Sequence, residues 1–120
     1  KERPMKVKPS IALIGGLWAC CLFDSSSTFA MDADEAQALA KKEGCLKCHA
    51  VDKKKEAKSL SEIGKSLKGK PDANAKLIHH FTSGEKVKFE DGKEEEHKVM
   101  KTKDKAAMQN LAEWILSLAK

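Results

Sequence analysis

The chain has 120 residues, enough for one domain. Charged residues make up 34% of it, and 23 basic against 18 acidic side chains leave a formal net charge of +5. Because this excess is mild and aromatic side chains are only 5% of the residues, the composition argues against a nucleic-acid-binding protein.

The first thirty residues have the pattern of a secretory signal peptide. Lys6 and Lys8 precede an apolar run at 11–23, and small residues follow up to Ala30. This run of 13 residues is shorter than the ~20 that a membrane span needs, and a buried core helix is the competing interpretation. We predict a signal peptide at 1–30, with residues 1–4 upstream of an initiator Met5, and a folded domain at 31–120.

A signal peptide predicts a periplasmic protein. The alternative is a lipid anchor at Cys20, since Leu17-Trp18-Ala19-Cys20 resembles a lipoprotein box. Trp18 is an awkward residue in such a box, so we favour release of Cys20 with the signal peptide.

The first helix of the domain is expected from Asp32 to Gly44. Asp32 offers an N-capping side chain, and a glycine commonly ends a helix. Small and apolar residues fall on one face of this helix: Ala36, Leu39 and Ala40.

Two further helices follow a polar loop at 50–58. Ser59 and Glu62 form a capping-box pattern, which predicts a short helix ending near Leu67. Asp72 can cap a third helix, which runs to about Gly84.

A hairpin and a fourth helix complete the domain. Residues 87–90 alternate apolar and polar, and Asp91-Gly92 is a two-residue hairpin signal before the returning arm at 93–96. The last helix starts near Thr102 or Asp104. Its apolar residues recur at helical spacing: Met108, Leu111, Ile115 and Leu118, with Trp114 beside them. The sequence thus predicts a mainly α domain.

The pattern that carries chemistry is Cys45-Leu46-Lys47-Cys48-His49, which is typical of c-type haem attachment. Two thiols separated by two residues can each bond to a vinyl group of one porphyrin, and the adjacent histidine can then bind the iron. A thioredoxin-type redox pair would need a βαβ pattern, which is not visible. A zinc site would need two further ligands, and the adjacent His79 and His80 lack the usual ligand spacing. A structural disulfide between Cys45 and Cys48 would close only a short loop.

These features resemble a class I c-type cytochrome of the bacterial periplasmic kind, over essentially all of residues 31–120. The resemblance implies a cytochrome c fold, with about four helices around one covalent haem and a small hairpin before the last helix. It implies that the first and last helices cross and pack. The chain departs from the family where a Gly-Pro pair usually follows the haem histidine, because here the stretch reads Glu56-Ala57-Lys58-Ser59.

The family places the sixth iron ligand in the loop before the last helix, most often as a methionine. His97 and Met100 are both in that loop. The number of residues that usually separates this ligand from an aromatic residue like Trp114 favours His97. The frequency of methionine ligation in the family favours Met100, so both stay candidates. We do not expect His79 or His80 to be a ligand, and at least one of them should face solvent.

The resemblance predicts a one-electron carrier and not an enzyme, since no acid–base pair or nucleophile is evident. The alternative is a haem-based binder or sensor of small ligands, with an open or weakly held sixth site. The carrier would be a monomer that meets redox proteins with acidic docking surfaces. Five lysines are expected near the haem edge: Lys47, Lys53, Lys54, Lys55 and Lys58. They would either steer acidic partner proteins to this edge or only make the loop soluble.

Overall fold

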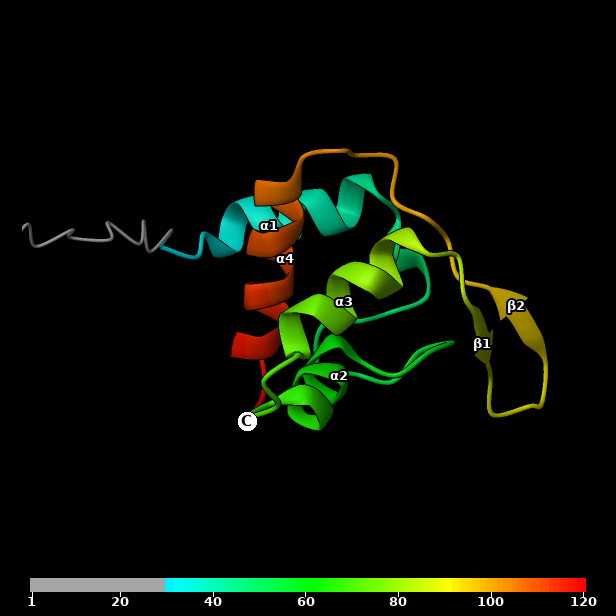
Figure 1. Cartoon of the computed structure of the whole chain (residues 1–120). Helices are drawn as coiled ribbons and strands as arrows, with labels where there is room; N and C mark the ends of the chain where they lie inside the picture. The colour runs from blue at the N-terminus through cyan, green and yellow to red at the C-terminus, as the bar shows by residue number, and fades with distance from the viewer. Residues whose placement is uncertain (1–29) are drawn as a thin grey trace, which may run out of the picture.

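The computed structural model describes residues 30–120. Except for Ala30, the predicted signal peptide, with Cys20, lies outside the described residues. Four helices and a small hairpin make up this part (Figure 1). They are α1 (Ala33–Lys42), the short 3-10 turn η1 (Cys45–Lys47), α2 (Leu60–Leu67), α3 (Ala73–Thr82), β1 (Lys86–Lys88), β2 (Glu94–Glu96) and α4 (Lys105–Ser117). None of the described helices is long and apolar enough to cross a membrane.

The helices begin where the sequence predicts, because capping side chains satisfy their first free amides. Asp32 accepts from Glu35 N at 3.0 Å, and Asp104 accepts from Ala107 N at 3.1 Å. The capping box before α2 is complete, with Ser59 and Glu62 bonded to each other's backbone amides. At α3 the prediction differs in detail, because the Asp72 carboxylate caps no amide and instead pairs with Lys76 at 3.0 Å.

The core lies where α1, α2 and α3 pack around α4. Close approach of α1 to α4 is possible because Ala36, Ala40 and Ala112, all fully buried, put no bulk between the two helices. The predicted contact between the first and last helices is therefore confirmed. Leu111 is buried at this crossing, which is drawn in Figure 1.

The hairpin projects from the helical body (Figure 1). Its strands are antiparallel, with Lys86 opposite Glu96 and Lys88 opposite Glu94. The turn differs from the predicted two-residue loop, because Phe89 N bonds to Lys93 O and Gly92 N bonds to Phe89 O. Residues 90–92 thus form a three-residue loop, in which Gly92 takes the left-handed conformation (φ 85°) that this loop type needs.

Candidate haem site

The predicted attachment cysteines lie in and just after η1. Gly44, at φ 79°, reverses the chain at the end of α1 and leads directly into this turn. His49 N donates to Cys45 O at 3.0 Å, so the turn holds the first thiol and the imidazole on one compact segment. Both cysteines are free and partly buried. Burial raises the pKa of Cys45, and burial together with Glu56 raises that of Cys48, which argues against a reactive low-pKa redox pair.

The His49 ring is oriented by the backbone of the loop that follows it. Its Nδ1 lies 2.6 Å from Lys58 O. Since a carbonyl can only accept, Nδ1 carries the hydrogen, and Nε2 is left with its lone pair free for a metal. Lys58 thus supplies the carbonyl that the missing Gly-Pro segment supplies in the resembling family.

A small apolar cavity of about 40 Å³ opens beside this histidine. Side chains from all four helices, from η1 and from the loop before α4 line it: Ala40, Cys45, His49, Leu60, Ile63, Leu77, His80, Phe81, His97, Leu111 and Ile115.

His97 lies across the cavity from His49. The centroids of their rings are 6.3 Å apart, with the planes at 49°. An imidazole nitrogen bound to a metal at about 2.0 Å puts its ring centroid about 3 Å from the ion, so two rings on opposite sides of one ion are about 6 Å apart. The pair therefore has the separation that a single metal between two imidazoles requires.

The surroundings of His97 favour the neutral imidazole, which is the form that binds metals. Burial lowers the pKa of His97, and the nearby His80 and His49 rings lower it further. Its Nδ1 is buried and has no hydrogen-bond partner within residues 30–120. The backbone of this segment is fixed, because His97 N donates to Glu85 O at 2.9 Å.

Met100, the other candidate for the sixth ligand, lies in the hydrophobic core. It is only 4% exposed and packs with the core cluster that includes Phe81 and Met108. Met100 N donates to Phe81 O at 2.9 Å, which ties the segment to the end of α3. It is not among the residues that line the cavity.

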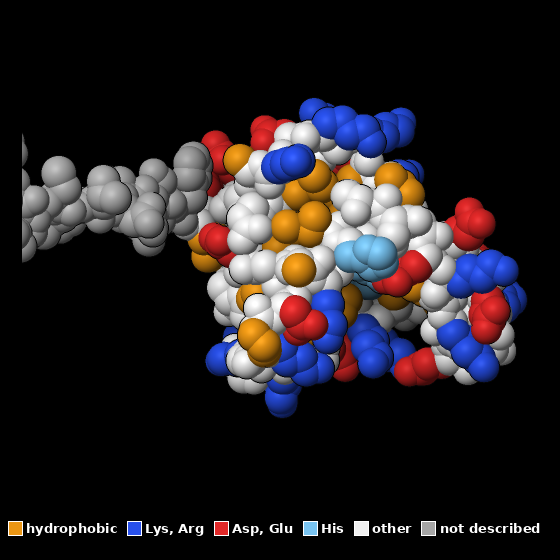
Figure 2. Space-filling model, viewed as in Figure 1, with side chains coloured by type: hydrophobic (Ala, Val, Ile, Leu, Met, Phe, Trp, Pro, Cys, Tyr) orange, Lys and Arg blue, Asp and Glu red, His pale blue; other side chains and the backbone are white. Residues whose placement is uncertain are grey.

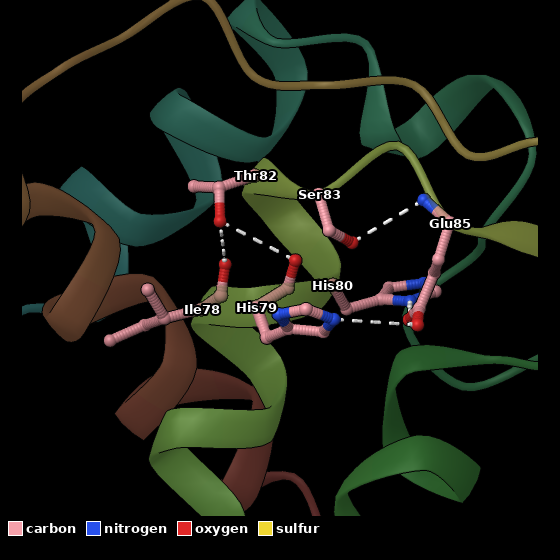
Figure 3. A network of polar contacts seen from close by, with 6 residues as sticks. All are labelled: Ile78, His79, His80, Thr82, Ser83 and Glu85. Carbon is pink, nitrogen blue, oxygen red and sulfur yellow. Dashed lines mark hydrogen bonds and ion pairs between the residues drawn. The ribbon is translucent and has the colours of Figure 1, made fainter.

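The two adjacent histidines of α3 have different surroundings (Figure 3). His79 is exposed, with 67% of its side chain accessible, as expected for at least one of the pair. His80 lines the cavity, and its ring centroid lies 3.8 Å from that of His97. The sequence predicts that neither histidine is a ligand. It does not predict that His80 lines the cavity. His80 follows the apolar Leu77 by three residues, and residues at this spacing lie on the same face of a helix. This spacing could have predicted that His80 faces the interior.

The lysines near the attachment segment are exposed, and two of them contact other parts of the chain. Lys54 forms an ion pair with Glu90 in the hairpin turn, and Lys55 Nζ donates to Leu46 O at 3.2 Å. Lysine and acidic side chains are intermixed over the face in Figure 2. On the same face, exposed histidine atoms lie next to acidic side chains (Figure 2).

Comparisons with known proteins found similar sequences and structures. The family model "Cytochrome c" matches residues 33–119. The chain is similar to the crystal structure of the class 1 cytochrome MtoD from Sideroxydans lithotrophicus ES-1, with 52% identity and a TM-score of 0.72, covering 76% of this chain and 100% of that one. It is also similar to wild-type cytochrome c552 of Nitrosomonas europaea, with 31% identity and a TM-score of 0.53, covering 72% of this chain and 99% of that one. A search of curated proteins found no match.

Proposed function

Because this chain belongs to the cytochrome c family, as a class I c-type cytochrome with one covalently bound haem, we propose that it is a periplasmic one-electron carrier whose iron is held by His49 and His97. The haem supplies an iron atom that can gain and lose one electron. The observation that carries the proposal is the separation of 6.3 Å between the His49 and His97 rings across an apolar cavity.

The proposal assigns a distinct role to each residue of the site. Cys45 and Cys48 hold the haem through two thioether bonds. His49 is the proximal ligand, kept in one tautomer and one orientation by Lys58 O. His97 would hold the iron from the other side, and the apolar wall would keep water away from it. With the iron held by two protein ligands, no position would be left for a substrate, which supports a carrier and not an enzyme.

The choice of His97 over Met100 rests on packing. Met100 fills the core, where methionine is a common gap-filler, and its side chain would have to leave that core to reach the cavity. A second imidazole in place of a thioether lowers the reduction potential. We therefore expect a lower potential than that of a related carrier with methionine ligation.

Spectra of three proteins test the ligand assignment. His97→Ala should convert the ferrous haem to a high-spin form that binds carbon monoxide readily, whereas Met100→Leu should keep the low-spin spectrum of the wild type. The ferric wild type should lack the far-red band that thioether ligation produces. The reverse pattern, with the low-spin form lost in Met100→Leu and kept in His97→Ala, would assign the ligand to Met100.

The same measurement distinguishes the carrier from a small-ligand sensor. A carrier with both axial positions filled should bind carbon monoxide slowly in the wild type. Rapid binding by a high-spin ferrous wild type would instead indicate a haem-based binder with an open site.

Docking of an acidic redox partner is proposed through the exposed lysines near the attachment segment. Lys54 and Lys55 already have contacts within the chain, so Lys47, Lys53 and Lys58 are the better candidates for intermolecular pairing. Charge-steered encounters weaken with ionic strength. Electron transfer to an acidic partner should therefore slow as salt rises, and Lys53→Glu should slow it at low salt.

A further inference from the structure

The His80 ring is held against the proposed sixth ligand. Its centroid lies 3.8 Å from that of His97, with the planes at 39°. Its Nδ1 lies 2.7 Å from Glu85 Oε1, and both residues belong to the network drawn in Figure 3. His80 is therefore anchored by Glu85 at one edge and packed on His97 at its side.

Glu85 also fixes the backbone of the ligand segment. Its carbonyl accepts from His97 N at 2.9 Å, while its carboxylate accepts from His80. One residue thus ties the His97 backbone and the His80 side chain to each other.

The two axial histidines are oriented in different ways. A metal-bound imidazole is usually fixed by a hydrogen bond from its second nitrogen. His49 has this bond, to Lys58 O, whereas the buried Nδ1 of His97 has no hydrogen-bond partner within the described chain. The His97 ring therefore lacks the kind of bond that fixes His49, and the contact that lies against its side is the His80 ring.

We propose that His80, anchored by Glu85, is a positioning residue that sets the orientation of the His97 ring and slows its release from the iron. This inference rests on the proposed assignment of His97 as the sixth ligand. In the ferric low-spin protein the angle between the two imidazole planes governs the largest g value of the electron paramagnetic resonance spectrum. That value is therefore a direct readout of the His97 orientation.

The test uses the mature holoprotein with haem attached. His80→Phe keeps a flat ring of similar volume beside His97 but loses the bond to Glu85, and Glu85→Gln removes the charge of the anchor. His79→Ala is the matched control, because His79 neighbours the same carboxylate at 3.7 Å but is exposed and does not line the cavity. Attached haem and the melting temperature are measured for every variant, so that a folding defect is recognised.

Two results are expected. His80→Phe and Glu85→Gln should shift or broaden the largest g value, and His79→Ala should leave it unchanged. Cyanide binding to ferric iron, which requires release of the sixth ligand, should be about tenfold faster in both variants, a typical effect of losing a partner that orients a metal ligand. The double variant should behave like either single variant, since both break the same interaction.

An unchanged g value and cyanide rate in correctly folded His80→Phe and Glu85→Gln would overturn the positioning role. Failure of the ligand assignment would look different, because His97→Ala would then stay low-spin. If His80→Phe became high-spin while His97→Ala did not, His80 itself would be the ligand, which overturns both proposals.

Discussion

Glu43 is a buried carboxylate at the end of α1 that accepts hydrogen bonds from the loop before α4. It is 6% exposed, and its two oxygens accept from Lys101 N at 2.6 Å and from Thr102 N at 3.2 Å. These bonds hold the chain that follows His97 and Met100 against the attachment turn. Glu43 thus links two segments that are far apart in the sequence.

Replacement of Glu43 by Ala should destabilise the protein by about 1–3 kcal/mol, because two part-buried amides lose their carboxylate acceptor. Urea unfolding of the holoprotein, followed by circular dichroism, measures the loss. Glu35→Ala, an exposed change in the same helix, is the control and should alter the unfolding free energy far less. A Glu43→Ala variant as stable as this control would show that water replaces the carboxylate at little cost.

At the scale of helices, the contact of α2 with α4 depends on a glycine. A Cβ atom built on Gly64 would lie 2.2 Å from Ile115 O, which is backbone and cannot move aside. Glycine inside a helix normally costs about 0.5–1 kcal/mol relative to alanine. Here the close approach of the two helices outweighs that intrinsic preference.

Gly64→Ala should therefore destabilise the protein, by about 2–3 kcal/mol, as overpacking of a tight contact does. The comparison is with Lys65→Ala, an exposed change in the next position of α2, which should be nearly neutral. Thermal unfolding of both variants measures the two changes in stability. A more stable Gly64→Ala protein would mean that α2 can shift away from α4 freely.

The capping box before α2 makes stability depend on pH. The hydrogen bond from Ser59 N, and after it the bond from the Ser59 hydroxyl, lowers the pKa of Glu62 below its ordinary value of 4.5. A carboxyl whose pKa is lower in the folded state contributes stability that is present above its unfolded pKa and is lost as the pH falls through the folded pKa.

Glu62→Gln should consequently reduce the difference in unfolding free energy between neutral pH and pH values below 4.5. Glu94→Gln, in the exposed strand β2, is the control and should leave that difference unchanged. Chemical unfolding at several pH values provides the measurement. Identical pH profiles for the wild type and Glu62→Gln would contradict a role of the ionised carboxylate.

At the scale of the whole molecule, the haem cavity interrupts the hydrophobic core. It is bordered by side chains of all four helices, so a group that fills it contacts each of them. The helices have only 8 to 13 residues, and isolated helices shorter than about 12–15 residues are marginal in water. The bound haem is therefore expected to be a large part of the core.

A Cys45→Ser/Cys48→Ser double variant, in which the covalent attachment is impossible, should lose most of its helical signal when purified without haem. Circular dichroism and thermal melting of the exported protein measure this, with Cys-retaining holoprotein as the reference. A cooperative melting transition and full helicity in the haem-free variant would show that the four helices fold around an unfilled cavity.

The local features were predictable because each depends on neighbouring residues. The attachment motif Cys45–His49, the caps at Asp32 and Asp104 and the helical stripe of α4 are all visible in short stretches of sequence. Fold class and cofactor follow from them, since the motif lies directly after the first helix and the last helix has an apolar face. The Asp91-Gly92 turn was predicted in the right place, but Gly92 closes a three-residue loop, because the strand register at Phe89 and Lys93 decides the loop length.

The sequence by itself determined that the domain is mainly helical and that Cys45, Cys48 and His49 form a haem-attachment motif, but it left both His97 and Met100 as candidates opposite His49. Only the tertiary structure shows that the two side chains lie in different places. Backbone bonds from His97 N to Glu85 O and from Met100 N to Phe81 O set the register of this segment against the end of α3. In that register His97 reaches the cavity and Met100 is buried in the core, because long-range hydrogen bonds, and not local spacing, decide which way each side chain points.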